Sequence, residues 1–327
     1  MEHQDKQNKK NSGKRKGLRL IWRGLIGLTV VAVLFVAVVF TVNRVSLHLE
    51  KDNIRSYGQL VPVDGQSMNI YMQGSGEETI VLLPGYGTAA PALDFKLLID
   101  ELAPDYRVIT VEPFGYGLSD GTDVERTSSN IVREIHEALQ QLGIDDFVLM
   151  GHSIAGIYSL EYVQAYPENV RAFIGIDSSV PNQPGMNEKL PVRTFDLLNR
   201  SGLLRLVKQF SGDPYASTSF DEATKEQMNL ISNKNASSPT MLNEMRHIST
   251  NFEAAQGLTF PAQLPVLLMV QADNSSFPEW VPLHEEQAAT VDNGQVITMD
   301  GEHYLHHTHA QEIAEATRVF LLQMQQK

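Results

Sequence analysis

The chain has 327 residues, a length that allows one large domain or two smaller ones. It contains no cysteine, which excludes disulfides, thiolate nucleophiles and cysteine-based metal sites. The net charge is −13, and because residues 1–23 carry +6, the rest of the chain carries −19. So acidic a remainder repels phosphate groups, and we therefore expect no nucleic acid partner.

The N-terminal part reads as a membrane anchor. Residues 1–23 form a basic tail, and residues 24–42 are an uncharged run rich in Val, Leu, Phe and Ala. Nineteen helical residues span about 28 Å, close to the thickness of the bilayer core. The positive-inside rule keeps the tail in the cytoplasm, so a single-pass membrane protein with its main domain outside the cytoplasm is predicted.

A cleaved signal peptide is the competing interpretation of the same segment. Signal peptides have a shorter apolar core, of about 7–15 residues, followed by small residues at the cleavage site. Residues 41–44 read Thr-Val-Asn-Arg and offer no such site. The anchor is therefore favoured, with residues 43–58 as a polar juxtamembrane linker.

From residue 59 onward, apolar runs bounded by turn residues alternate with amphipathic stretches. Asp64-Gly65 predicts a hairpin between the first two strands. Strands are predicted at 59–63, 68–73, 79–83, 106–111, 147–150, 171–176, 265–270 and 295–299. Helices are predicted at 127–142, at 154–166 and after a capping-box pattern at 308–311. This alternation predicts an α/β fold with a mostly parallel central sheet and helices on both faces.

One region breaks the alternation. Residues from about 180 to 258 show helical segments without a convincing strand, so we interpret them as a helical cap inserted into a domain that runs from 59 to 327. Its apolar side chains either line an apolar acyl pocket or form only the cap's own core. They are Phe195, Leu197, Leu198, Leu203, Leu204, Met228, Met241 and Met245.

Ser153 is the candidate nucleophile. It lies in Gly151-His152-Ser153-Ile154-Ala155-Gly156, directly after a predicted strand and before a predicted helix. The G-x-S-x-G pattern places a serine on a tight strand-to-helix turn, which needs small neighbours; Ala155 departs from the pattern by one methyl group. Alone, so short a pattern is more often an ordinary surface turn.

The wider context resembles the α/β-hydrolase fold family, from residue 59 onward except in the cap. Residues 82–87, Leu-Leu-Pro-Gly-Tyr-Gly, are similar to the family's loop after its third strand, and residues 112–120, Glu-Pro-Phe-Gly-Tyr-Gly-Leu-Ser-Asp, to the loop after the next strand. The resemblance implies a nucleophile, an acid and a histidine in that chain order. It implies Ser153, Asp273 and His303, with Asp177 as the alternative acid.

The resemblance also implies an oxyanion hole formed by the backbone N–H groups of Tyr86 and Ile154. No cofactor is expected. His306, His307 and His309 follow His303 and suggest a metal cluster as an alternative, but no H-E-x-x-H motif or regular ligand spacing is present, and we expect no metal. His152 is expected to be a packed or hydrogen-bonded residue rather than a second base.

These features predict a serine hydrolase that cleaves carboxylic esters with a small or apolar acyl group. A serine nucleophile argues against the dehalogenase and epoxide hydrolase relatives, and Ile154 against prolyl aminopeptidases, which usually have Trp there. Aminopeptidase, carbon–carbon bond hydrolase and perhydrolase or haloperoxidase chemistry stay open. A non-catalytic module that binds a ligand or a partner is the alternative from another class. Protein partners are unknown; the bilayer and a small ester are the expected ones.

Overall fold

The computed structural model describes residues 2–186, 188–236, 238–275 and 277–326, with side chains from Arg19 onward. The chain divides into two compact units. The first, called unit 1 here, consists of residues 1–49 and 197–212. The second, unit 2, consists of residues 50–196 and 213–327 and contains the sheet.

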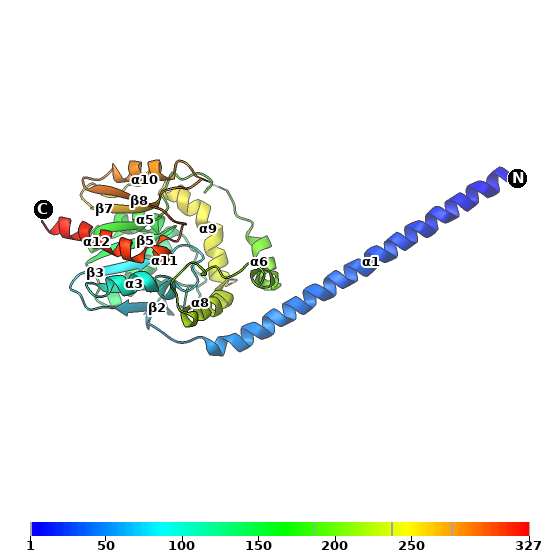
Figure 1. Ribbon diagram of the computed structural model, residues 1–327, viewed down its shortest axis with the longest axis horizontal. Helices are drawn as coiled ribbons and strands as arrows, with labels where there is room; N and C mark the ends of the chain where they lie inside the picture. The colour runs from blue at the N-terminus through cyan, green and yellow to red at the C-terminus, as the bar shows by residue number, and fades with distance from the viewer. Residues whose placement is uncertain (1, 187, 237, 276, 327) are drawn as a thin grey trace. The chain divides into compact units, whose positions relative to one another are not determined.

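Unit 1 is built on one long helix, α1 (Glu2–Glu50), which Figure 1 shows in blue. The stretch Arg19–Asn53 is long and apolar enough to cross a bilayer, with a mean hydropathy of 2.9 in its most apolar window. The helix continues past residue 42 to Glu50, so the first half of the segment that we interpreted as a linker is helical, and a short 3-10 helix follows at Lys51–Asn53. The other part of unit 1 holds the end of α6 (Val192–Arg200) and all of α7 (Leu203–Lys208).

Unit 2 contains an eight-stranded sheet in the order β1-β2-β4-β3-β5-β6-β7-β8. The strands are β1 (Gln59–Val63), β2 (Gln66–Gln73), β3 (Thr79–Leu83), β4 (Arg107–Glu112), β5 (Phe147–His152), β6 (Val170–Ile176), β7 (Val266–Gln271) and β8 (Gly294–Met299). β1 and β2 form the predicted hairpin, β2 pairs antiparallel with β4, and all later pairs are parallel. The predicted fold class is confirmed.

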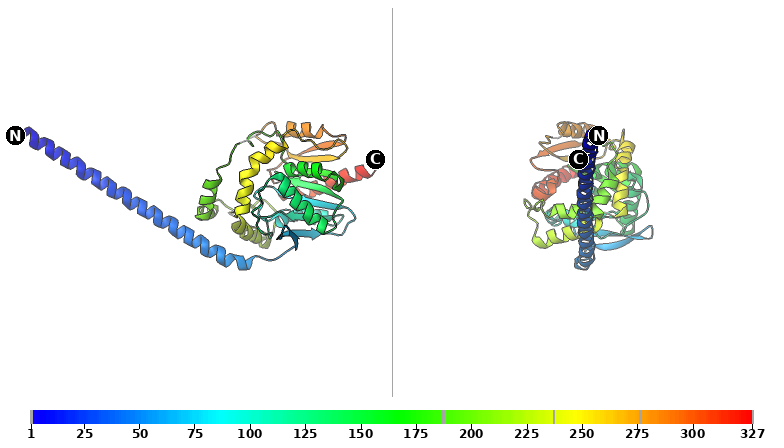
Figure 2. Two further views of the ribbon diagram at one scale, coloured as in Figure 1. Left: turned by 180° about the vertical axis from the view of Figure 1, so that it is seen from behind. Right: turned by 90° about the vertical axis from the view of Figure 1, so that its right-hand side faces the viewer.

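Helices cover both faces of the sheet (Figures 1 and 2). α4 (Ser128–Gln141), α5 (Ala155–Ala165), α9 (Pro239–Ala255) and α10 (Trp280–Ala288) supply residues to one apolar core, while α3 (Lys96–Leu102) and α12 (Ala310–Gln325) supply the other. α4 forms where expected for two reasons. The Thr127 side chain caps its N-terminus by accepting a hydrogen bond from the backbone N–H of Asn130, and the apolar face of the helix is buried. The short helices α2 (Pro91–Asp94) and α11 (Leu305–Thr308) lie near the carboxyl ends of the strands they follow.

Between β6 and β7 the described chain forms only helices: α6, α7, α8 (Glu222–Asn235) and α9. The predicted capping box at 308–311 is not formed. Residues up to Thr308 belong to α11, and α12 begins after His309 without a side-chain cap, because the Thr308 hydroxyl is paired with the His309 ring instead.

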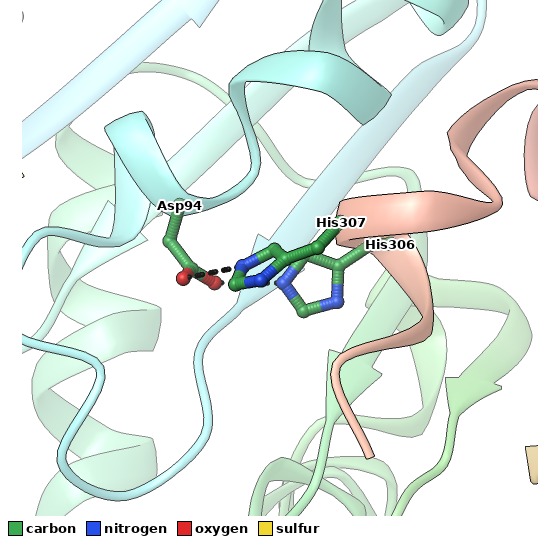
Figure 3. Close-up of side chains that lie close together, drawn as sticks. All are labelled: Asp94, His306 and His307. Carbon is green, nitrogen blue, oxygen red and sulfur yellow. Dashed lines mark hydrogen bonds and ion pairs between the residues drawn. The ribbon is translucent and has the colours of Figure 1, made fainter. Parts of the chain in front are cut away.

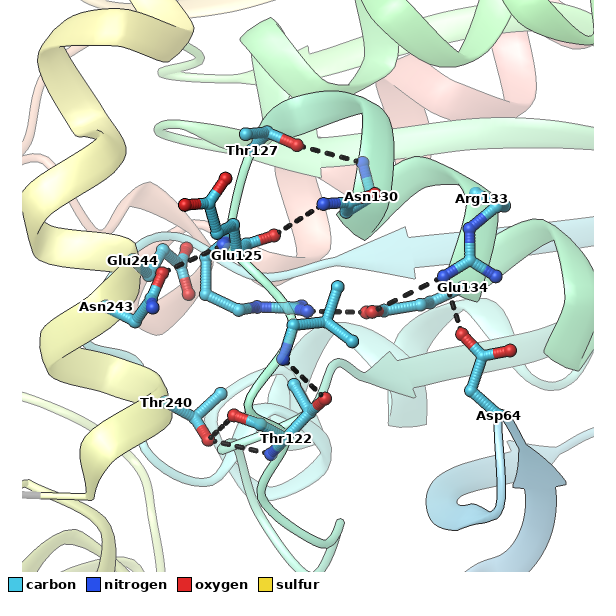
Figure 4. Close-up of polar contacts among 12 residues, drawn as sticks. Asp64, Thr122, Glu125, Thr127, Asn130, Arg133, Glu134, Thr240, Asn243 and Glu244 are labelled. Atoms are coloured by element: carbon cyan, nitrogen blue, oxygen red, sulfur yellow. Dashed lines mark hydrogen bonds and ion pairs between the residues drawn. The ribbon is translucent and has the colours of Figure 1, made fainter.

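Polar side chains tie α9 to the segment before α4, as Figure 4 shows. The Thr240 hydroxyl exchanges hydrogen bonds with the backbone of Thr122, and the Asn243 side chain accepts one from the Arg126 amide. The Arg126 guanidinium is itself paired with Glu134 at 2.6 Å, and both side chains are fully buried. These contacts satisfy backbone hydrogen-bonding groups of the loop, and they therefore fix α9 beside the carboxyl ends of the strands.

The motif at residues 112–120 is a structural turn. Glu112 is buried and accepts hydrogen bonds from the Tyr57 hydroxyl, the Asn69 amide group and the Leu118 backbone N–H. Burial raises the pKa of this carboxyl, although those donors oppose the shift. Gly117 has a φ of +51°, and a Cβ there would lie 1.7 Å from the Glu112 carboxylate, so the turn requires glycine at this position.

Candidate active site

Ser153 occupies a strained turn between β5 and α5. Its φ is +57°, a conformation that residues other than glycine rarely adopt. The turn is tightly packed: a Cβ on Gly151 would lie 3.0 Å from the Ala155 methyl group, and one on Gly156 would lie 2.3 Å from the Ser179 carbonyl oxygen. The Ala155 methyl group fits because residue 151 is glycine. On the helix side of the turn, the position that requires glycine is Gly156.

A hydrogen-bonded chain links Ser153 to a histidine and an acid. His303, in the loop after β8, has its Nε2 atom 2.9 Å from Ser153 Oγ and its Nδ1 atom 2.6 Å from Asp177 Oδ2. Asp177 follows β6, so the chain after β5, β6 and β8 contributes one of the three side chains each. The His303 side chain is 44% exposed and that of Asp177 is 1% exposed. The chain thus runs from an accessible base to a buried carboxylate.

The prediction that Asp273 partners His303 is wrong in this structure, and Asp177, the alternative, takes that position. β6 and β7 are adjacent and parallel, so both acids follow strands at the same edge. Asp177 has a φ of +42° and accepts a hydrogen bond from the backbone N–H of Gln271. The Asp273 side chain lies two residues beyond that contact and is exposed.

Trp280 was missed by the sequence reasoning. Its indole Nε1 atom donates a hydrogen bond of 2.6 Å to Asp177 Oδ1, from the first turn of α10. With His303 and the Gln271 amide, this donor gives the buried Asp177 carboxylate three hydrogen bonds. Such bonds compensate the cost of burying a charge and fix the direction of the carboxylate. Nothing in the local pattern around Trp280 indicates a link to residue 177.

The loop at residues 84–87 lies against the Ser153 turn. A Cβ on Gly85 would be 2.9 Å from the Ser153 Cβ and 2.8 Å from His152 Nδ1, so only glycine allows this approach. The approach brings Tyr86 to the same cavity as Ser153 and Ile154. In the described part of the chain, the backbone N–H groups of Tyr86 and Ile154 have no hydrogen-bond partner.

A cavity of about 450 Å³ opens above Ser153 and His303. Its remaining walls are mostly apolar and come from Tyr86, Ile154, Ser179, Gln183, Pro184, Met186, Ile248, Phe252, Gln271, Asn274, Phe277 and Trp280. None of the eight cap residues that were expected to line an acyl pocket is among these lining residues. The apolar wall comes instead from the segment after β6, from the end of α9 and from the region of α10.

His152 supports the loop that carries His303. It is fully buried, and its Nε2 atom lies 3.1 Å from the backbone carbonyl oxygen of His303, to which a neutral ring donates. Burial lowers the pKa of His152 well below its usual range, and the nearby rings of His306 and His303 lower it further. The ring therefore stays neutral, as a packed and hydrogen-bonded residue.

Asp94, His306 and His307 form another cluster of side chains, shown in Figure 3. Asp94 accepts hydrogen bonds from the Nε2 atoms of His306 at 2.7 Å and His307 at 2.8 Å. Burial alone would raise the pKa of Asp94, but the two imidazoles outweigh it and hold the pKa below its usual range. The three donor atoms lie within 4.8 Å of one another, a spacing a metal ion could use. The two hydrogen bonds to Asp94 join α2 to α11.

Comparison with known proteins identifies the class. The α/β hydrolase fold matches residues 78–309, and the chain belongs to this family. It is 28% identical over 265 residues to the uncharacterized protein YbdG of Bacillus subtilis (strain 168), covering 77% of this chain and 81% of the relative.

Two further proteins that the chain is similar to have named activities. The 2-hydroxy-6-oxo-6-(2'-aminophenyl)hexa-2,4-dienoic acid hydrolase of Metapseudomonas resinovorans is 24% identical over 174 residues, which are 53% of this chain and 60% of that protein. Among solved structures, epoxide hydrolase VrEH1 from Vigna radiata matches with a TM-score of 0.65 at 15% identity, covering 81% of this chain and 97% of that one. The structural match is evidence of the fold alone.

Proposed function

We propose that this member of the α/β-hydrolase family is a serine hydrolase that cleaves carboxylic esters with a small or apolar acyl group. The observation that carries the proposal is the hydrogen-bonded chain from Ser153 through His303 to Asp177 at the floor of an apolar cavity. A serine, a base and an orienting acid in this order are the requirement for acyl transfer through a covalent intermediate.

The proposed reaction begins with attack by Ser153 Oγ on the acyl carbon. With its Nδ1–H donated to Asp177, His303 has a free lone pair on Nε2, and this atom takes the serine proton as the new bond forms. His303 then returns the proton to the leaving alcohol, and the acyl-enzyme remains. Water attacks the acyl-enzyme in the second half, with His303 again as the base.

The Tyr86 and Ile154 amides form the proposed oxyanion hole. Both residues line the cavity beside Ser153, and neither amide is used elsewhere in the described structure. Preorganised N–H donors stabilise the negative charge that develops on the carbonyl oxygen, and losing one costs about 3 kcal/mol of transition-state stabilisation. The close packing of Gly85 on Ser153 supports this role, because it holds the donor loop beside the nucleophile.

The walls of the cavity support an uncharged, apolar acyl group. His303 is the only residue with an ionisable imidazole, carboxylate or basic group among the described lining residues. A substrate with a carboxylate, such as the acid named for the Metapseudomonas resinovorans relative, would find no Lys or Arg side chain among these lining residues. The epoxide hydrolase neighbour shares the fold. In this chain the proposed nucleophile is a serine, Ser153, which favours acyl transfer.

For location, we propose that α1 anchors the protein in a membrane with residues 1–23 in the cytoplasm and unit 2 outside it. The support is the apolar stretch of α1 and the basic residues before it.

Labelling with a fluorophosphonate probe tests the proposal, using the full chain purified in detergent. Wild type is expected to be labelled at Ser153 and to hydrolyse p-nitrophenyl esters, and Ser153→Ala to do neither. Ser179→Ala is the matched control, since Ser179 lines the same cavity. A folded wild type that is neither labelled nor active would leave the non-catalytic binding module as the better interpretation.

A panel of uncharged esters, amides and a vinylogous 1,5-diketone then separates the reaction classes. Faster turnover of the esters is expected; preferred cleavage of the diketone would instead point to carbon–carbon bond hydrolysis.

A further inference from the structure

The segment from Leu197 to Gly212, called the α7 segment here, packs on helix α1 within unit 1. Gly202 has a φ of +82°, and a Cβ on it would lie 2.7 Å from the Asn43 Cβ and 3.1 Å from the Val39 carbonyl oxygen. The Arg205 guanidinium donates a hydrogen bond to Asn43 Oδ1 at 3.3 Å. The contact is close enough to exclude any side chain at residue 202.

This contact lies where the apolar stretch of α1 ends. Residues 24–42 are uncharged, and Asn43 and Arg44 follow them directly. Asn43 is buried, and Val39, Ser46 and Leu47 are partly shielded, at the spacing of one helix face, while the apolar residues before Val39 are exposed. The α7 segment is therefore attached to α1 at the depth where an anchor helix leaves the hydrocarbon for the headgroups.

The α7 segment also exposes large apolar side chains. Leu197 is 70% exposed, Val207 59% and Phe210 83%, and Leu198 is exposed as well. Phe210 is the most exposed large apolar residue in the described part of the chain. Such side chains close together on one short segment indicate a surface that is covered by an apolar partner.

The charge of the segment points to the chemistry of that partner. Between residues 197 and 212 the basic residues are Arg200, Arg205 and Lys208, and no Asp or Glu occurs. The chain beyond residue 23 carries −19, so this segment is a basic island in an acidic protein. Basic side chains combined with exposed Leu, Val and Phe are the composition of helices that lie in the interface of anionic membranes.

We propose that the α7 segment lies in the bilayer interface, in the leaflet from which unit 2 emerges, beside the helix that crosses the membrane. Leu197, Val207 and Phe210 enter the region between headgroups and acyl chains, and the net positive charge of the segment favours a leaflet that contains anionic phospholipids. The inference rests on the proposed anchor and is independent of the ester chemistry, so each can fail without the other.

The absence of cysteine from the chain allows a direct test. Single cysteines replace Phe210, Val207, Val33 in the apolar stretch of α1, or the exposed Leu322 on α12, and each carries the fluorophore NBD. The full-length proteins are reconstituted in vesicles of phosphatidylethanolamine and phosphatidylglycerol. We expect Phe210→Cys and Val207→Cys labels to show blue-shifted emission and several-fold stronger quenching by shallow spin-labelled lipids than by aqueous iodide. The Leu322→Cys label is expected to show the reverse.

The remaining arms identify the source of any shielding. Gly202→Val should detach the segment from α1 and lower the lipid quenching at a Phe210→Cys label while leaving a Val33→Cys label in the bilayer. Replacing phosphatidylglycerol by phosphatidylcholine should weaken the quenching. Iodide quenching of the Phe210→Cys label equal to that of Leu322→Cys would overturn the proposal. So would shielding from both quenchers, which would indicate a second copy of the chain, and an aqueous Val33→Cys label, which would remove the anchor itself.

Discussion

Asp177 accepts three hydrogen bonds, from His303, Trp280 and the Gln271 amide, although its side chain is 1% exposed. A buried carboxylate with this set of donors is held in one orientation, and it holds the His303 ring in turn. The ring must present Nε2 to Ser153 as an acceptor, and the bond from Nδ1–H to Asp177 selects that tautomer.

Replacing this acid separates it from the other candidate. Asp177→Asn presents an amide that can donate to Nδ1 and favours the wrong tautomer, so kcat for ester hydrolysis is expected to fall by about 10⁴-fold. Asp273→Asn is the matched control, and its kcat should equal that of wild type because the side chain is exposed and His303 Nδ1 is paired with Asp177. Steady-state kinetics on a p-nitrophenyl ester measures both; a dead Asp273→Asn beside an active Asp177→Asn would reverse the assignment.

The pairing of Ser153 with His303 could be predicted from the sequence because the signals of both residues are local. Ser153 lies between a strand and a helix among small residues, and His303 follows the last strand. The acid could not be selected in the same way, because Asp177 and Asp273 both follow neighbouring parallel strands. Only the left-handed turn at Asp177 and the distant Trp280 decide which carboxylate reaches the ring.

Helix α9 is held by polar contacts as well as by its apolar face. The Arg126–Glu134 pair beside it and the exposed Arg133–Asp64 pair have the same separation, 2.6 Å. They differ in burial, since both side chains are fully buried in the first pair and about 40% exposed in the second. Burial decides how much each pair contributes to the free energy of unfolding, because in the buried pair the loss of one partner leaves the other charge out of contact with solvent.

Two amide substitutions test this difference. Glu134→Gln removes the hydrogen-bonded counter-ion of the buried Arg126 charge and is expected to lower the free energy of unfolding by about 3 kcal/mol. Asp64→Asn removes the exposed pair at a position whose φ of +49° asparagine tolerates, and should cost under about 1 kcal/mol. Urea denaturation followed by circular dichroism gives both values. Equal losses from the two substitutions would contradict the argument.

Glu244 on α9 gives a pH-dependent contribution. Its carboxyl accepts hydrogen bonds from the Tyr116 and Tyr158 hydroxyl groups, and burial raises its pKa. The folded chain therefore keeps this proton to a higher pH than the unfolded chain. The contribution to stability is complete below the unfolded pKa, about 4.3, and declines as the pH rises through the folded pKa.

Glu244→Gln keeps an acceptor for both tyrosines and removes the titration. We expect its free energy of unfolding to fall less than that of wild type as the pH rises above about 4.3. Glu253→Gln, at an exposed position on the same helix, should follow the wild-type profile. Denaturation at a series of pH values measures the slopes, and a Glu244→Gln profile parallel to wild type would show that this carboxyl does not carry the dependence.

The cap shows which structural features can be predicted from a sequence pattern. Helical periodicity indicated helices without strands between β6 and β7, and the structure has α6 to α9 there. The pattern marks a buried face, but it does not say which neighbour covers that face. Met241 packs in the interior and Met228 beside a separate cavity, while Leu197 is exposed in unit 1. The cavity over Ser153 is lined instead by Met186, Phe252 and other residues near the ends of elements.

The proposed topology makes a prediction for the full-length protein in cells. Helix α1 should keep the protein in the membrane pellet after alkaline carbonate extraction, because its apolar stretch crosses the bilayer. A Leu322→Cys variant should react with a membrane-impermeant maleimide in intact cells, since Leu322 is exposed on unit 2 and the chain has no other cysteine. Release by carbonate would contradict the anchor, and labelling only after lysis would reverse its orientation.

Helix α1 continues to Glu50, and only Ile54–Gly58 separates the following 3-10 helix from the first strand. Five extended residues reach at most about 18 Å. The Gln227 side chain further bonds the backbone at Asn53 and Arg55 within unit 2, which shortens the free length. On a tether this short, the proposed enzyme would not sample the surrounding volume as a free protein does. It would stay close to the membrane surface, where compounds that partition into the lipid have their highest local concentration.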